Sequence, residues 1–151
     1  MGYDSTNDTN EHRKQVNKLL CDVRLDLRKR GVYHDLSKLG EPEKEIFDIV
    51  TPKLKALTYG SEEYRESLKE MGKALEHHYM KNRHHPEHFK NGIDDMSLLD
   101  VVEMLADWKA ATLRHADGDI IKSLDINRKR FGISNQFYKI LLNTINALGW
   151  R

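Results

Sequence analysis

Residues 98–115 form the stretch LLDVVEMLADWKAATLRH. Its apolar residues lie nearly all round a helix, which predicts a helix buried among other helices. Glu103 and Asp107 interrupt that apolar character, and because they are four residues apart they share one face of the helix. A carboxylate in a buried helix is costly unless it is paired or holds a metal ion. Asp107 is therefore a candidate metal ligand, the alternative being an ion pair with Arg114 on the same face.

The segments on both sides of this stretch also have helical patterns. Apolar residues recur at helical spacing in residues 10–30, where we expect Gly31 to end the helix. We expect further helices after Pro42, from Ser61 to about Asn82, near Asp119–Arg130 and near Ser134–Leu148. Ser97 and Asp100 have capping-box spacing before the helix that runs to about His115. With no strand alternation, the chain is predicted to be all-α, with six or seven helices.

Composition favours one compact, soluble helical domain. The chain has 151 residues, of which 25 are basic and 24 acidic, for a net charge of +1. We therefore expect no strong nucleic-acid or membrane interaction, although an oligomer stays possible. One cysteine and the absence of a secretory signal indicate a cytoplasmic protein. The polar residues 1–9 are expected to form a flexible arm before a single domain at 10–151.

His34 and Asp35 are the first candidate ligands along the domain. Two adjacent ligands cannot both point the same way from a regular helix, but they can reach one ion where a helix bends. The alternative is an ordinary surface turn, because a His-Asp pair alone is a weak signal. His12 lies four residues before Val16 and so extends the inward-facing stripe of the first helix.

Histidines gather between residues 77 and 88. Stepping by three or four residues from Tyr64 leads to His78, which predicts that His78 faces the core, whereas His77 falls on the solvated face. A lone histidine there would more often be a core residue with satisfied hydrogen bonds. His84 and His85 follow in a loop, however, and Pro86 favours a non-helical backbone at His85. The chain can therefore fold back and bring His84 or His85 towards His78.

Imidazole and carboxylate ligands without thiolates suit Fe, Mn, Co or Zn, and Mg is possible. His77 and His88 are expected either to face solvent or to contact a metal-binding residue without binding the ion themselves.

Several motifs resemble the HD-domain superfamily of metal-dependent phosphohydrolases. HDLSK, residues 34–38, resembles the H-D-x-x-K signature, and HHPEHFKNG resembles the paired histidines of the HD-GYP branch without its GYP triplet. VVEMLADWKAAT resembles the helix that carries the last aspartate of the superfamily. Across most of its length, including RFGISNQ and NTINALGW, the chain looks most like a small uncharacterised family of phages and bacteria.

The resemblance implies a compact HD-like helical bundle with one or two divalent metal ions. The minimal ligand set would be His12, His34, Asp35 and Asp107. His78, with one or both of His84 and His85, would add a second ion.

The implied reaction is hydrolysis of a nucleotide or a related phosphate ester by a metal-activated water. Lys38 occupies the position that contacts substrate phosphate in some relatives and would neutralise developing charge. Glu103 is a candidate to orient water or a metal-bound histidine, and its alternative is a pair with Arg114. Arg83 and Lys109 are weaker candidates for binding substrate phosphate.

Two other functions remain open from the sequence. Some proteins of the HD fold use a diiron site for oxygenation, and the same ligands fit that chemistry. A non-catalytic nucleotide-binding or interaction module is the second alternative, although a binding module needs no open metal position.

Overall fold

The structure is a computed structural model that describes residues 2–58, 60–114 and 118–151. Every regular element in these ranges is helical, with seven α-helices, three short 3-10 helices and no strand. The all-α expectation is therefore confirmed. None of the described helices is long and apolar enough to cross a membrane. The chain divides into two compact units, Met1–His34 and Asp35–Arg151. The expectation of one domain over residues 10–151 stays a prediction.

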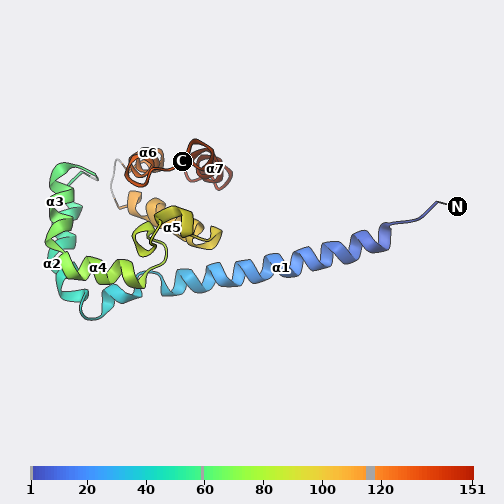
Figure 1. The fold of residues 1–151 in the computed structure, drawn as a ribbon, viewed down its shortest axis with the longest axis horizontal. Coiled ribbons are helices and arrows are strands. Elements are labelled where there is room, and N and C mark those ends of the chain that lie inside the picture. Colours follow the sequence, from blue (N-terminus) through green and yellow to red (C-terminus); the bar gives the residue numbers. More distant parts are fainter. Residues whose placement is uncertain (1, 59, 115–117) are drawn as a thin grey trace. The chain divides into compact units, whose positions relative to one another are not determined.

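The first unit is the helix α1, Thr6–Tyr33 (Figure 1). It differs from the sequence-based expectation at both ends. Residues 6–9, expected in a flexible arm, are helical, and Asp8 in the first turn stabilises the positive end of the helix dipole. Gly31 does not end the helix, since its φ is not positive and a helical glycine costs only about 1 kcal/mol relative to alanine.

The first part of the second unit comprises the 3-10 helix η1 (Leu36–Leu39) and the helices α2 (Lys44–Lys55), α3 (Glu62–Glu70) and α4 (Gly72–Lys81). Helices α2 and α3 lie side by side (Figure 1), and α2 continues past Pro52 to Lys55. The single helix expected from Ser61 to Asn82 is broken between α3 and α4. Gly72 has φ +45°, which is left-handed and cannot continue a right-handed helix.

The second part comprises the 3-10 helices η2 (Pro86–His88) and η3 (Gly92–Asp95) and the helices α5 (Leu98–Thr112), α6 (Ile120–Phe131) and α7 (Asn135–Ala147). The predicted capping box at the start of α5 is present, because Ser97 and Asp100 exchange side-chain and backbone hydrogen bonds. The expected end of that helix, near His115, lies outside the described residues. Ser134 caps α7 through the backbone N–H of Phe137.

The hydrophobic core lies among α5, α6 and α7, which gather on one side of the second unit (Figure 1). Its fully buried members include Met104, Leu105, Leu124, Leu141 and Ile145. Met104 and Leu105 face this core, while Glu103 on the same helix contacts a histidine from the loop after α4. Helix α5 thus connects the core to the polar cluster described next.

Candidate metal centre

Asp35, His78, His84 and His85 converge in the second unit, with one potential ligand atom from each lying within 4.8 Å of all the others. The Nε2 atoms of His78 and His84 each lie 3.3 Å from Oδ1 of Asp35. Nε2 of His78 lies 2.9 Å from Nε2 of His85. Four donors arranged tetrahedrally at about 2.0–2.1 Å from a zinc ion would be ~3.3 Å apart. The cluster therefore has the dimensions of a metal coordination sphere.

Asp35 has the only positive φ among the described non-glycine residues, with φ 57° and ψ 14°. Aspartate tolerates this left-handed backbone better than most residues do. This conformation starts η1, where the N–H of Lys38 donates to the carbonyl of Asp35. Backbone strain of this kind is concentrated at functional sites. The left-handed backbone of Asp35 thus stands at the start of η1, and its carboxylate belongs to the cluster.

His78 is placed by the register of α4. It is 2% exposed and follows the buried residues Met71 and Ala74 at helical spacing. The prediction that His78 faces the core is confirmed. The neighbouring His77 keeps a quarter of its side chain exposed, and its Nδ1 lies 2.7 Å from Oε1 of Glu43. His77 therefore contacts a partner of His78 and is outside the ligand cluster.

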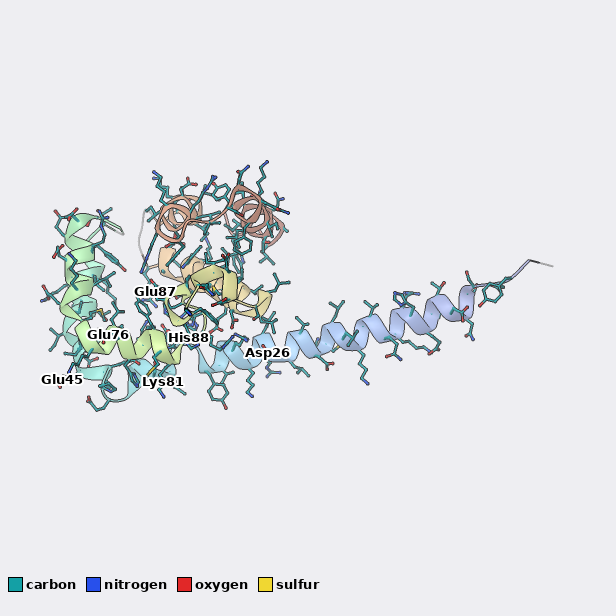
Figure 2. All side chains as sticks on the ribbon, in the orientation of Figure 1. Asp26, Glu45, Glu76, Lys81, Glu87 and His88 are labelled. Carbon is teal, nitrogen blue, oxygen red and sulfur yellow. The ribbon has the colours of Figure 1, made fainter. Side chains whose placement is uncertain are left out.

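The loop after α4 folds back as Pro86 predicts. His85 has the extended backbone that precedes proline, and its ring lies 4.1 Å, centroid to centroid, from the ring of His84. Three contacts anchor this loop to other elements: Arg83 with Asp100, Arg130 with Glu87, and His88 Nδ1 with the carbonyl of Tyr79. Figure 2 labels Glu87 and His88 in this loop. The loop histidines are therefore held by a fixed backbone.

Two of the imidazoles have a carboxylate on the nitrogen that faces away from the cluster. Nδ1 of His78 lies 2.9 Å from Oε2 of Glu43, and Nδ1 of His84 lies 3.2 Å from Oε1 of Glu103. A carboxylate at this position fixes the ring and the tautomer of a metal-binding histidine. Glu103, a sequence-based candidate for orienting water or a metal-bound histidine, lies against the ring of His84.

Burial lowers the pKa of both His78 and His85 and so favours their neutral forms. Burial lowers the pKa of His85 to about 2, with further lowering by His84 and His78. Burial also lowers the pKa of His78, with help from the ammonium of Lys38, against the opposing effects of Asp35 and Glu43. Burial alone raises the pKa of Glu43, but hydrogen bonds from His77, Ser37 and His78 outweigh it and lower that pKa. Neutral imidazoles beside ionised carboxylates are the protonation states that a metal ion requires.

The donor set fits a divalent transition metal. It offers imidazole nitrogens and a carboxylate oxygen without thiolate, which suits Fe, Mn, Co or Zn. The carboxylates of Asp35, Glu43 and Glu103 all contact imidazoles of the cluster. If His78 and His84 carry their protons on Nδ1, their Nε2 lone pairs point towards the Asp35 oxygen, an arrangement that a cation stabilises.

The other predicted site residues divide into those near the cluster and those elsewhere. Asp107 lies one turn beyond Glu103 on α5 and has an oxygen within 4.8 Å of a nitrogen of His84. Lys38 Nζ lies 2.5 Å from Oδ2 of Asp35. Arg83 instead makes a two-point contact with Asp100, and Lys109 is half-buried near the end of α5.

His12 and His34 belong to the first unit, on α1 and at its C-terminal cap. Their participation in the centre stays a prediction.

Sequence reasoning missed Glu43, Ser37 and Asn82. Asn82 stands four residues after His78 on the same helical stripe, and Ser37 lies within the HDLSK motif. Asn82 and Ser37 could therefore have been identified from the sequence as neighbours of the candidate ligands. Nothing in the sequence singles out Glu43, because it is one of several glutamates in the charged segment 41–45. Only its burial in the folded protein distinguishes it.

Comparisons with known proteins give a family but no activity. No curated protein and no solved structure matches the chain. The resemblance to HD-domain enzymes therefore rests on the motifs alone. The model of the Family of unknown function (DUF5662) matches residues 1–147, so the chain belongs to that family.

Proposed function

We propose that this protein is a metal-dependent phosphohydrolase acting on a nucleotide or a related phosphate ester. One observation carries the proposal: three buried or half-buried imidazoles and one carboxylate converge, and carboxylates contact the outward nitrogens of two of the imidazoles. Burying this many polar groups costs free energy unless they are hydrogen-bonded, paired with opposite charge or coordinated to a metal ion. The motifs HDLSK and HHPEH add support, since they resemble those of HD-domain phosphohydrolases.

The residues around the cluster suit phosphate chemistry. A divalent metal bound here would supply Lewis acidity and lower the pKa of a bound water. The positive charge of Lys38 lies beside Asp35 and 4.9 Å from the centre of the Phe47 ring, with 30% of the side chain exposed. The ammonium is thus held in place yet accessible from solvent. It can neutralise charge on a phosphoryl group.

The test is metal analysis followed by a substrate screen. The protein, purified with added Fe, Mn, Co or Zn, should contain one or two ions per chain. It should hydrolyse at least one substrate in a panel of nucleoside monophosphates, nucleoside diphosphates and cyclic dinucleotides. Model phosphomonoesters and phosphodiesters would separate the two reaction types.

Asp35→Asn is the diagnostic variant, because it keeps the side-chain shape but removes the ligand charge. It should lose metal and at least about 100-fold in kcat/KM, as expected when several kcal/mol of transition-state stabilisation are removed. Asp48→Asn is the matched control, since Asp48 is exposed on α2 and pairs only with Lys44 in the contacts described here. A wild-type protein that binds no metal would overturn the proposal. Metal binding with oxygen consumption, or with no turnover at all, would instead favour an oxygenase or a binding module.

A further inference from the structure

Glu43 is a fully buried carboxylate that immediately precedes α2. Its Oε1 lies 2.7 Å from Nδ1 of His77, and its Oε2 lies 2.9 Å from Nδ1 of His78 and 3.1 Å from Oγ of Ser37. A buried carboxylate without such partners would be strongly destabilising. Of these partners, His78 is a member of the candidate metal cluster, and His77 and Ser37 lie outside it.

Counting protons in this network assigns the tautomer of His78. Nδ2 of Asn82 lies 2.8 Å from Oγ of Ser37 and from the carbonyl oxygen of His78, and 3.0 Å from Nδ1 of His78. Its two amide protons can satisfy the two shorter contacts, so Nδ1 of His78 does not have to accept from Asn82. The hydroxyl proton of Ser37 is then directed to Glu43. An ionised carboxylate only accepts hydrogen bonds, so the contact between Glu43 and His78 requires a proton on Nδ1 of His78. In a neutral imidazole the lone pair is then on Nε2, which faces Asp35 and His85.

We propose that Glu43 is a positioning residue that fixes His78 in the Nδ1-protonated form, orients its ring, and thereby sets the metal affinity of the centre. The inference rests on the proposed function for the presence of the ion. Glu43 acts through His78 and lies on the far side of that ring from the cluster. It does for His78 what Glu103 does for His84.

His77 is the second anchor of Glu43. With each oxygen of Glu43 accepting from a different histidine of α4, the carboxylate cannot rotate without breaking a contact. The start of α2 therefore contributes to the centre through Glu43 at its N-terminal cap and through Phe47, whose ring centre lies 5.5 Å from that of His78. This also explains why consecutive histidines occur in α4: one belongs to the ligand cluster and the other holds the carboxylate.

The first experiment measures the tautomer directly in the metal-free wild-type protein. Long-range ¹H–¹⁵N correlation spectra distinguish a protonated from an unprotonated imidazole nitrogen, and comparison with His78→Gln assigns the signals. We expect a protonated Nδ1 and an unprotonated Nε2 at His78. The reverse pattern would overturn the proposal, whatever happens to the folding of any Glu43 variant.

The second experiment compares Glu43→Gln with Glu45→Gln. Glu45 is exposed in the first turn of α2 (Figure 2), so its substitution controls for the loss of one charge nearby. Competition with a chromophoric chelator should show metal affinity about 10–100-fold weaker for Glu43→Gln than for Glu45→Gln. The visible spectrum of the Co²⁺-loaded protein should change in Glu43→Gln alone. Equal affinities in the two variants would refute the positioning role.

The two proposals fail in different ways. If the wild-type protein binds no metal, the proposed function is wrong. The tautomer measurement still decides in that case whether Glu43 fixes the protonation of His78. A wild-type protein that binds metal, together with an unaffected Glu43→Gln variant, sinks only the inference about Glu43.

Discussion

His77 and His78 are adjacent in the sequence but have different surroundings. The helix turns about 100° per residue, so one side chain enters the cluster while the other stays a quarter exposed. The sequence pattern alone suggests that His77 matters little. The structure changes that expectation, because His77 holds one oxygen of the buried Glu43. Loss of its imidazole would leave that oxygen without this donor.

At the residue scale we expect three graded outcomes. His78→Ala should remove about one metal ion per chain or abolish turnover, since it deletes a ligand and leaves a cavity. His77→Ala should retain the metal stoichiometry but weaken metal affinity by no more than about tenfold, because it acts through Glu43. His88→Ala should leave metal affinity unchanged, since His88 contacts the carbonyl of Tyr79 and the ring of Phe89, which are both outside the cluster. Metal titration checks all three, and greater damage from His77→Ala than from His78→Ala would contradict the assignment.

At the scale of the element, α5 fixes two consecutive residues of the loop after α4. Asp100 and Glu103 lie three residues apart, on the same face of α5, and contact Arg83 and His84 respectively. Asp100 is fully buried and also caps the helix through Ser97. The start of α5 therefore sets the position of the loop that carries His84 and His85.

Asp100→Asn should lower the free energy of unfolding by about 1–2 kcal/mol, because it weakens a helix cap and removes the charge from the contact with Arg83. Urea denaturation measures this loss, with Asp94→Asn in the exposed part of η3 as the control. Arg83→Ala should cost less, since the guanidinium side chain is 52% exposed. The double variant should be less destabilised than the sum of the two single variants.

A raised KM for Arg83→Ala without any loss of stability would show that Arg83 serves the substrate instead. The pairing with Asp100 would then be incidental to function.

At the scale of the whole molecule, the centre makes folding depend on pH. His85 in the folded chain has a pKa of about 2, and the pKa of His78 is lowered as well. In the unfolded chain both return to about 6.5. Between these limits the unfolded state binds more protons than the folded state, so acid favours unfolding.

The metal-free protein should therefore lose stability as the pH falls below about 6.5. One such group contributes up to about 1.4 kcal/mol per pH unit, which corresponds to roughly 3–6 °C in melting temperature for a chain of this size. Thermal melts from pH 7.5 to pH 4.5 in the presence of a chelator provide the measurement. His85→Gln should flatten the slope. A melting temperature that rises on acidification would show that His85 is charged in the folded state.

Local sequence patterns account for those features of the protein that depend on neighbouring residues. Helical periodicity placed His78 towards the interior, the Ser97–Asp100 spacing marked the start of α5, and Pro86 forced an extended backbone at His85. Each of these depends on residues within about two helical turns, where chain geometry leaves few choices. The break at Gly72 and the continuation through Gly31 were missed, since glycine permits both conformations and its surroundings select one.

Which carboxylate supports which imidazole depends instead on the packing of the helices. Glu43 contacts His78 across 35 positions of sequence, and Glu103 contacts His84 from a different helix. Such pairs depend on how helices pack, and no local pattern distinguishes Glu43 from the exposed glutamates beside it. Burial gives Glu43 its importance: a carboxylate removed from water must find donors, and the packing supplies them from His77, His78 and Ser37.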